Sequence, residues 1–363
     1  MYPYNAPMHF LILSSKGRGA GCILRARGIA RGLARHGHTV QVLPPFPTLP
    51  FWLDMALDGI WYFLAGLFVR SDVAVGIKPY PTLVPALLWQ KAVHGAKVVL
   101  DVDDLDYAYG TGRFLEFHKA LQLPWPRRAD RVTYHNPHLK GPLKSVFGVK
   151  EERLVPLPQG VVTERFRPFK PGPRDLPRSA RAFLGASRPD PLLVYTAHLN
   201  QACGLAEILE SLAVLKRHLP RVGLLVAGGG PDLSHLRSVA RQRGVEDRVR
   251  FTGLLKQEQV AACLNLADLV LVYYGISAAN KHRASMKLRE ALACRAQVVA
   301  THVGEIHHFA RHVHLSSPDP HSFARAVRRA LKGPRKPPLP AEALKRLNWG
   351  DCVRSLERKV RPV

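Results

Sequence analysis

Cysteine and acidic side chains are scarce in this sequence of 363 residues, which has 5 cysteines and 27 acidic against 53 basic residues. The cysteines are far apart, so neither a disulfide framework nor a metal site is indicated; they are Cys22, Cys203, Cys263, Cys294 and Cys352. The first 15 residues lack the pattern of a secretory signal peptide. These absences predict a protein of the reducing cytoplasm that holds no metal.

Long apolar runs are also missing. Segment 51–69 is apolar and aromatic, but Asp54 and Asp58 interrupt it, and its charge-free part is too short for a spanning helix of roughly 20 residues. We expect this segment to be buried against a sheet. The alternative is a helix whose face dips into a membrane, with three interfacial anchors, Trp52, Trp61 and Tyr62.

The formal net charge of +26 creates a surface field that attracts polyanions. Basic residues are spread along the chain without an RNA-binding aromatic motif or zinc-finger spacing, so we expect no nucleic-acid partner. Phosphorylated substrates and the anionic inner face of the cell membrane remain as candidate partners. Each Lys or Arg near such a membrane adds about 1 kcal/mol of favourable binding free energy. A generally basic proteome in the source organism would produce the same composition.

The first half of the chain alternates apolar runs with helical periodicity. Residues 9–15 form an apolar run that ends in a glycine-rich turn, and residues 22–38 continue with apolar side chains at helical spacing. Further apolar runs follow at 39–45, 72–79 and 96–104. Alternation of this kind predicts a parallel sheet that is covered by helices on both faces.

The same pattern starts again after the proline-rich and charged stretch 165–177. Strands are predicted, with helices between them, at 192–199, 222–231, 249–253 and 269–274. The sequence therefore predicts an α/β protein of two Rossmann-like, doubly wound parallel-sheet domains that face each other across a cleft. The expected division is a first domain at 1–168, a linker at 169–187, a second domain at 188–345, and a helix at 346–363 that returns to the first domain.

Several segments, taken in order, resemble the retaining group 1 glycosyltransferases of GT-B architecture. Residues 129–168 are similar to the domain junction of that family, and VGLLVAGGGP followed by VRFTG and LADLVLVYY is similar to its donor-domain run. The segment SMKLREALACRAQVVAT, at 285–301, is similar to the family's donor-site motif. The resemblance implies transfer of a sugar from a nucleotide-sugar donor, held by the second domain, without a cofactor or a divalent ion. The basic composition and the apolar segment 51–69 suit a lipid-linked or cell-surface glycan as the acceptor.

The donor's diphosphate requires cationic side chains and helix N-termini. Lys281, Arg283 and Lys287 lie beside the predicted start of the helix at 286–294, where the helix dipole adds to their charge. By resemblance, Glu290 accepts hydrogen bonds from the donor ribose; a plain Lys–Glu helix pair is the alternative for Lys287 and Glu290. The glycine run of Gly228, Gly229 and Gly230 predicts either a close approach to the nucleotide or a tight turn.

In the first domain, a glycine turn and an acidic run are the candidate site residues. Gly17, Arg18, Gly19 and Gly21 lie at a strand-to-helix turn, and the resemblance implies that this loop faces the acceptor and the donor phosphates. The acidic run consists of Asp101, Asp103, Asp104 and Asp106 and ends a predicted strand. We predict that Asp103 or Asp104 orients the acceptor hydroxyl; helix capping is the alternative. His118 and His135 are lesser candidates.

Two charges that are usual in the family are missing. The segment AHLNQACG places His198 where the family has Arg and Cys203 where it has Lys, and His282 stands near the expected first Glu of a Glu-x7-Glu pattern. Arg295 and Gln297 replace the usual Gly and Pro after the helix. Two hypotheses follow: a divergent but active transferase, or a scaffold that has lost catalysis and serves as a sugar- or nucleotide-binding partner of another enzyme.

Overall fold

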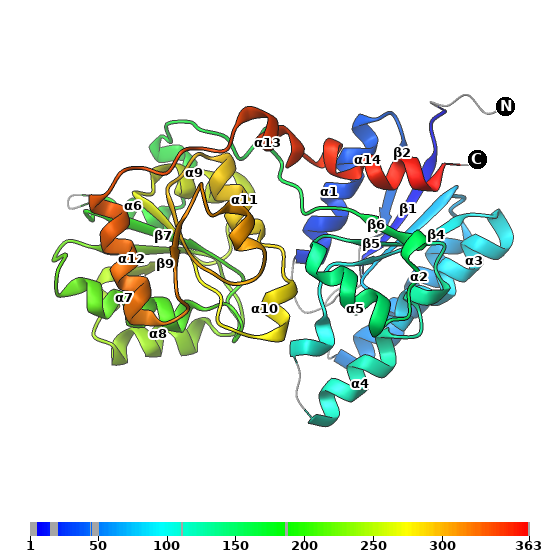
Figure 1. Cartoon of the computed structure of the whole chain (residues 1–363), viewed down its shortest axis with the longest axis horizontal. Coiled ribbons are helices and arrows are strands. Elements are labelled where there is room, and N and C mark those ends of the chain that lie inside the picture. Colours follow the sequence, from blue (N-terminus) through cyan, green and yellow to red (C-terminus); the bar gives the residue numbers. More distant parts are fainter. Residues whose placement is uncertain are drawn as a thin grey trace. The chain divides into compact units, whose positions relative to one another are not determined.

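The computed structural model describes residues 6–14, 21–43, 45, 51–109, 112–185 and 188–361. The chain divides into two compact units, each of which is described by itself (Figure 1). Unit 1 consists of residues 1–160, 282–284 and 345–363, and unit 2 consists of residues 161–281 and 285–344.

Unit 1 contains a six-stranded parallel sheet in the order β2-β1-β3-β4-β5-β6. Its strands are β1 (His9–Ser14), β2 (Thr39–Leu43), β3 (Val73–Ile77), β4 (Lys97–Val102), β5 (Arg131–Tyr134) and β6 (Leu154–Pro156). Its helices are α1 (Gly21–Arg35), α2 (Phe51–Leu67), α3 (Val84–His94), α4 (Gly112–Gln122), α5 (Lys140–Ser145) and α14 (Trp349–Val360). The apolar side chains of β1, β3 and β4 are almost fully buried, as both faces of a covered parallel sheet require.

Unit 2 contains a second six-stranded parallel sheet, in the order β12-β11-β10-β7-β8-β9. Its strands are β7 (Leu192–Thr196), β8 (Gly223–Ala227), β9 (Val249–Phe251), β10 (Leu269–Val272), β11 (Val298–Thr301) and β12 (His314–Ser316). Its helices are α6 (Arg178–Phe183), α7 (Leu205–Lys216), α8 (Leu233–Gln242), α9 (Gln257–Leu266), α10 (Ala278–His282), α11 (Met286–Ala293), α12 (Pro320–Lys332) and α13 (Ala341–Arg346), the ends of α10 and α13 passing into unit 1.

The predicted fold class, two Rossmann-like parallel sheets with flanking helices, is confirmed. In each sheet the strand order reverses at one place, between β1 and β3 in unit 1 and between β7 and β10 in unit 2. The carboxyl ends of the strands at such a reversal are where open α/β sheets bind ligands. Ligand-binding residues are therefore expected at the carboxyl ends of the strands at these two reversals.

The division into units differs from the expected ranges around the linker. Unit 2 begins at residue 161, because Phe166 is buried and the Phe169 amide donates to Asn265 Oδ1 at 3.0 Å. The expected linker contains α6, and its Leu176 is 9% exposed. In unit 1, Trp349 of α14 fills the space beside Gly28, where a Cβ would lie 2.1 Å from the indole.

Helix α2 has one buried face and one exposed apolar face, so each of the two interpretations of segment 51–69 fits one face of it. Tyr62 is fully buried and donates to the Ser14 carbonyl at 2.6 Å, so its prediction as an interfacial anchor is wrong. The opposite face carries exposed Ile60, Trp61 and Leu64. The side chain of Trp52 lies outside the described residues. Among the residues that the structure describes, no helix combines the length and the apolar character needed to cross a bilayer.

Candidate functional site

In unit 1, the end of β4 carries the acidic run, but its four carboxylates do different work. Asp101 forms a buried forked ion pair with Arg25 of α1, with Nε–Oδ2 and Nη2–Oδ1 distances of 2.6 and 2.8 Å. Thr133 Oγ1 of β5 donates to Asp101 Oδ1 at 2.5 Å. Because its oxygens are taken up by these partners, Asp101 joins a helix to the sheet and is not available to a substrate.

Lys78 provides the counter-charge for the rest of the run. It follows β3 with a left-handed backbone (φ 68°), a conformation that is uncommon for a residue with a side chain and that often marks a functional site. Its Nζ lies 2.5 Å from Asp106 Oδ1 and 3.6 Å from Asp103 Oδ1. Burial lowers the pKa of Lys78, but Asp103 and Asp106 outweigh it, so the side chain stays charged.

Asp103 and Asp104 differ from their neighbours because each has an oxygen, Oδ1, that is buried without a hydrogen-bond partner among the described residues. Burial raises the pKa of both carboxyls, and that of Asp104 reaches about 7 because the neighbouring charge of Asp103 raises it further. Buried oxygens without partners are rare in native proteins and mark groups that await a ligand. These are the predicted acceptor-side residues, and the structure places them together.

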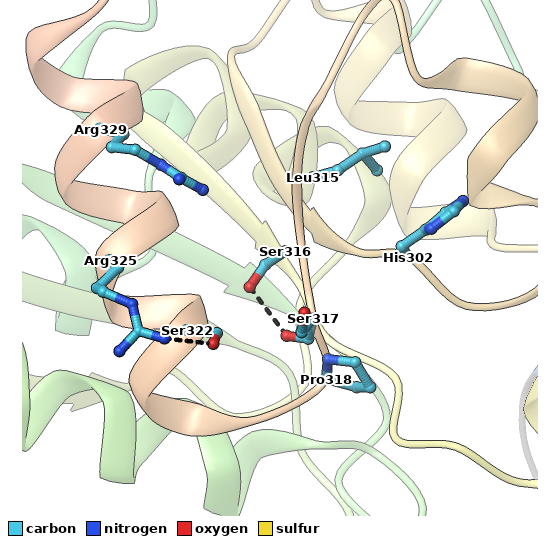
Figure 2. Close-up of a pocket in the computed structure, with 8 residues that line it drawn as sticks. All are labelled: His302, Leu315, Ser316, Ser317, Pro318, Ser322, Arg325 and Arg329. Atoms are coloured by element: carbon cyan, nitrogen blue, oxygen red, sulfur yellow. Dashed lines mark hydrogen bonds between the residues drawn. The ribbon is translucent and has the colours of Figure 1, made fainter.

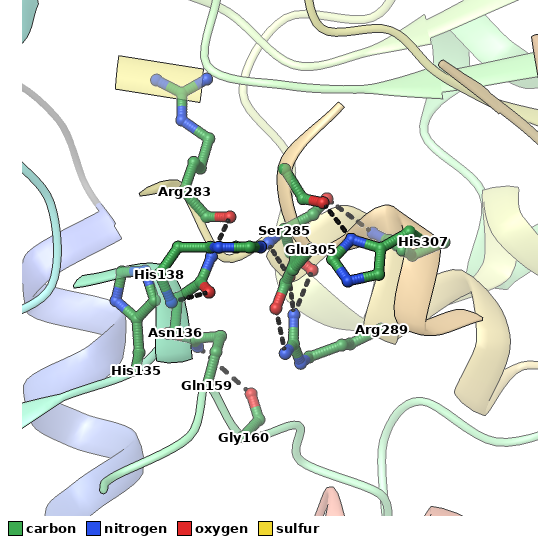
Figure 3. Close-up of polar contacts among 12 residues, drawn as sticks. His135, Asn136, His138, Gln159, Gly160, Arg283, Ser285, Arg289, Glu305 and His307 are labelled. Carbon is green, nitrogen blue, oxygen red and sulfur yellow. Dashed lines mark hydrogen bonds and ion pairs between the residues drawn. The ribbon is translucent and has the colours of Figure 1, made fainter. Parts of the chain in front are cut away.

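Arg283, predicted as one of the phosphate-binding cations, belongs to unit 1 in the structure, and its phosphate-binding role stays a prediction. Asn136 Nδ2 donates to the carbonyls of His282 and Arg283, both at 3.2 Å, which holds residues 282–284 against unit 1 (Figure 3). The positive charge of Arg283 lowers the pKa of Asp104, against the larger effect of burial. His135 shares the contact through its Nε2, 3.3 Å from the His282 carbonyl.

In unit 2, α11 begins beside the strand reversal and is held by a buried ion pair. Ser285 caps the helix by accepting from the Leu288 amide at 3.2 Å. Glu305 accepts from the Ser285 amide at 2.6 Å and forms a forked pair with Arg289, whose Nη2 lies 2.6 Å from Oε2 (Figure 3). The helix start is thereby fixed from both sides, as a site of defined geometry requires.

Lys287, in the first turn of α11, lies against two aromatic rings at the carboxyl ends of β7 and β10. Its Nζ donates to Tyr195 Oη at 3.0 Å and lies 4.2 Å from the centroid of that ring and 5.5 Å from that of Tyr274. Tyr195 Oη in turn donates to the Cys203 carbonyl. The ammonium is therefore positioned at the switch point of the sheet, where the dipole of α11 adds to its charge.

Glu290 lies on the same helix, one turn after Lys287. Burial raises the pKa of its carboxyl to about 8, and the charges of Lys287 and Arg165 only partly oppose this effect. The side chain is therefore protonated at neutral pH in the absence of a ligand. A carboxyl that is held neutral in this way is typical of a binding or catalytic position, although burial for structural reasons produces the same shift.

The chain after β7 crosses the glycine run after β8. A Cβ on Gly228 would lie 1.8 Å from the Ala197 carbonyl oxygen, and one on Gly230 would lie 2.2 Å from that of Leu199. The Leu199 amide donates to the Gly229 carbonyl at 3.0 Å. These glycines are needed for backbone packing, which is the tight-turn alternative, and they also place exposed His198 at the carboxyl edge of the sheet.

The other predicted site residues are distributed as follows. Gly17, Arg18 and Gly19 lie outside the described residues. Lys281 is exposed on α10. Cys203 is buried in the core of unit 2, where it supplies a backbone carbonyl but no charge. His118 is buried beside Tyr80 and Phe117 and serves as a packing residue.

Three functional positions were missed by sequence reasoning: Lys78, Tyr195 and Glu305. Lys78 lies beside prolines in KPYP, a turn signal that does not announce a buried cation. Tyr195 is one aromatic residue within a predicted buried strand, and its hydroxyl contact with Lys287 spans 92 positions of sequence. Glu305 follows Gly304, whose φ is 63°. This glycine is a local signal of a turn, and the turn brings the Glu305 side chain to the start of α11, where it accepts from the Ser285 amide.

Comparisons with known proteins find one matching family model and several named relatives. Residues 178–346 match the family model described as "Glycosyl transferases group 1". The GDP-mannose-dependent alpha-(1-6)-phosphatidylinositol monomannoside mannosyltransferase of Mycobacterium tuberculosis is 33% identical over 140 residues, covering 39% of this chain and 35% of that protein. The chain therefore matches about a third of the length of this curated relative.

Two further similarities extend over most of the chain. The N-acetyl-alpha-D-glucosaminyl L-malate synthase of Bacillus anthracis is 26% identical over 310 residues, covering 78% of this chain and 76% of that protein. Among solved structures, Anabaena HepE in complex with UDP and glucose has a TM-score of 0.66 at 17% identity, covering 96% of this chain and 94% of that chain. At this identity the structural likeness shows the fold.

Proposed function

We propose that the chain is a group 1 glycosyltransferase and transfers a sugar from a nucleotide-sugar donor to an acceptor hydroxyl, with retention at the anomeric carbon; the family match of residues 178–346 supports this proposal. One observation carries the assignment of the donor site to unit 2: Lys287 lies at the N-terminus of α11, beside the carboxyl ends of β7 and β10. An anionic diphosphate is favoured at such a position by the ammonium and by the helix dipole.

In the proposed reaction the bond between the anomeric carbon and the donor phosphate breaks, and the nucleoside diphosphate leaves. Lys287 stabilises the negative charge that develops on the leaving phosphate. The acceptor oxygen forms the new bond on the same face, and its proton passes to the departing diphosphate. Glu290 binds the donor ribose, where the carboxyl can both donate and accept hydrogen bonds in its protonated state.

We assign the acceptor hydroxyl to Asp103 and Asp104 of unit 1, whose buried Oδ1 atoms accept no hydrogen bond from the described residues; Asp103 Oδ1 lies 3.6 Å from Lys78 Nζ, in an ion pair. A carboxylate oxygen that accepts the hydroxyl proton in a hydrogen bond orients the attacking lone pair. The proposal requires an acceptor held by unit 1 to reach a donor held by unit 2. It includes no metal and no cofactor, so turnover should survive EDTA.

The acceptor that we propose is a lipid-linked or surface glycan, and the proposed location is the inner face of the cell membrane. The mycobacterial relative is named for a phosphatidylinositol mannoside. In unit 1, helices α2 and α3 pack together and expose Ile60, Leu64 and Phe68 together with Leu88 and Val93. Apolar side chains on a protein of net charge +26 suit an anionic lipid surface. Replacing Leu64 and Phe68 by Ser should weaken sedimentation with phosphatidylglycerol vesicles.

The decisive experiment is a thermal-shift screen against UDP, GDP, ADP and TDP, followed by turnover with sugars of the nucleotide that binds. Binding of the correct nucleotide raises the melting temperature, since it stabilises only the folded state. Lys287→Ala should abolish this shift, whereas Lys216→Ala, which changes a half-buried lysine of the same unit that pairs with Asp247, should preserve it. No shift with any nucleotide would refute the proposal.

A second candidate function rests on the two missing charges. Cys203 is buried and uncharged, and His198 replaces an arginine of the family, so the diphosphate meets fewer fixed cations than the resemblance implies. A chain that binds a nucleotide but turns over none of its sugars would be a binding partner for another enzyme. The same screen separates these two functions.

A further inference from the structure

A basic groove runs along the free edge of the unit 2 sheet, beside edge strand β12 and helix α12. Two cavities of about 470 and 880 Å³ adjoin there and share Arg325 and Arg329 (Figure 2). We call this surface the β12 groove and define it by its six basic side chains, which are Arg325, Arg328, Arg329, Lys332, Arg335 and Lys336.

Asp319 offsets part of the charge of this groove, because hydrogen bonds from Ser322 and, to a smaller extent, the charge of Arg325 lower the pKa of its carboxyl. No carboxylate lines either cavity, and within the described ranges none of the six has an ion pair with an acidic side chain. Arg325 donates to Ser322 Oγ at 2.7 Å. The nearest acidic residue, Asp319, uses its carboxylate to cap α12, accepting from the Ser322 amide at 2.8 Å.

The basic side chains are arranged as one stripe. Arg325, Arg329 and Lys332 are spaced at four and three residues on α12, so they are neighbours on the helix surface. Like charges at these spacings destabilise a helix by a few tenths of a kcal/mol each. A bound anion removes that repulsion and converts the stripe into a favourable contact.

Two hydrogen bonds hold the segment after α12 in place, so its basic side chains extend the stripe of basic residues on that helix. The Lys336 amide donates to Gln297 Oε1 at 2.7 Å, and Gln297 Nε2 donates to the Lys336 carbonyl at 3.0 Å. His314 of β12 lines the groove, and its Nε2 is buried without a partner among the described residues. The hydroxyls of Ser316, Ser317 and Ser322 line the smaller cavity (Figure 2). Guanidinium, hydroxyl and imidazole groups are the donors that phosphate oxygens accept.

The groove is separate from the donor position. Within the unit 2 sheet, β12 is an edge strand, and β11 separates it from β10 at the switch point where Lys287 lies. We propose that the β12 groove is a second anion site, which binds phosphate groups of a ligand other than the nucleotide-sugar donor. The phosphates come either from the headgroups of an anionic lipid surface or from a free phosphate compound.

The test compares Arg325→Gln/Arg329→Gln with a control of equal charge, Arg181→Gln/Arg217→Gln, which changes two exposed arginines of unit 2 outside the groove. Lipid binding is measured by sedimentation with phosphatidylcholine vesicles that contain or lack phosphatidylglycerol. Binding of free phosphate is measured by calorimetry with inorganic pyrophosphate, in parallel with Lys287→Ala, which removes the donor-site cation. Circular dichroism verifies that each variant is folded.

We expect the groove variant to lose at least tenfold in affinity in one arm, and that arm identifies the source of the phosphate. The control pair and Lys287→Ala should retain binding at the groove. Loss of anion binding at the donor site can therefore be distinguished from loss of anion binding at the groove. Equal losses in the groove and control variants would show diffuse charge attraction and overturn the proposal. Absence of wild-type binding in both arms would overturn it as well.

Discussion

Glu290 provides a sharp test of the burial on which its donor-site assignment depends, because this burial makes the stability of the protein depend on pH. Burial raises the pKa of this carboxyl from 4.5 to about 8 in the folded state. The folded protein therefore binds a proton that the unfolded chain releases above pH 4.5. The stability that this proton contributes is fully present below pH 4.5 and is lost as the pH rises through 8.

The magnitude follows from the size of the displacement. Each pH unit between the unfolded and folded pKa values corresponds to about 1.4 kcal/mol, which gives an upper limit of about 5 kcal/mol. Glu290 is partly exposed, so we expect about 3 kcal/mol. Glu290→Gln keeps the shape and removes the titration. The variant should match the wild type at pH 5 and exceed its free energy of unfolding by about 3 kcal/mol at pH 9.

Urea unfolding followed by far-UV circular dichroism at pH 5, 7 and 9 measures this difference. All five tryptophans, at positions 52, 61, 89, 125 and 349, lie in unit 1, so their fluorescence reports separately on the unit that the change does not touch. Glu246→Gln, which alters an exposed carboxylate of unit 2, is the matched control. A difference between Glu290→Gln and wild type that stays constant from pH 5 to pH 9 would refute the reasoning.

The remaining predictions concern turnover and the supports of the site. Lys287→Ala and Glu290→Ala should each reduce kcat by at least tenfold, about 1.4 kcal/mol of transition-state stabilisation, and near-normal rates in both would contradict the site assignment. Because burial and Asp103 raise the pKa of Asp104 to about 7, kcat/KM should rise with pH up to about 7 as this carboxylate ionises, and Asp104→Asn should flatten that limb of the profile. Glu305→Gln leaves Arg289 charged and buried, so it should cost about 3–5 kcal/mol in unfolding free energy, whereas Arg289→Met/Glu305→Leu should recover much of this loss.

The sheets could be predicted from the sequence because their strands are buried on both faces. Residues 192–199 were predicted as a strand from an unbroken apolar run, and β7 occupies 192–196 of it. The run does not mark the end of the strand, because the next residues stay apolar while the chain turns toward the glycine run. Helix starts were found where a local cap exists, as at Ser285, whose side chain accepts from the Leu288 amide.

The candidate site was harder to predict because its residues meet through the fold. Four aspartates look alike in the sequence, yet Arg25 takes up Asp101 and Lys78 pairs with Asp106. Arg25 lies 76 positions from Asp101 in the sequence, and Lys78 lies 28 positions from Asp106, so no local sequence pattern indicates these pairs. Arg283 was grouped with Lys287 because the two are close in sequence, whereas the structure assigns residues 282–284, which contact Asn136, to unit 1; its phosphate-binding role stays a prediction.

The resemblance implies that His198 and Cys203 stand in place of two charged residues, and the remaining cations would then carry more of the phosphate binding. Cys203 carries no charge, but its carbonyl accepts from Tyr195, and that same hydroxyl accepts from Lys287. The position that lacks an ammonium is thus linked through one tyrosine to the ammonium that remains. Two aromatic rings beside Lys287 attract its ammonium and limit its movement, which reduces the entropy that is lost when a phosphate binds. Since fewer cations share the diphosphate, removal of Lys287 should cost more here than in a site where Arg and Lys occupy the positions of His198 and Cys203.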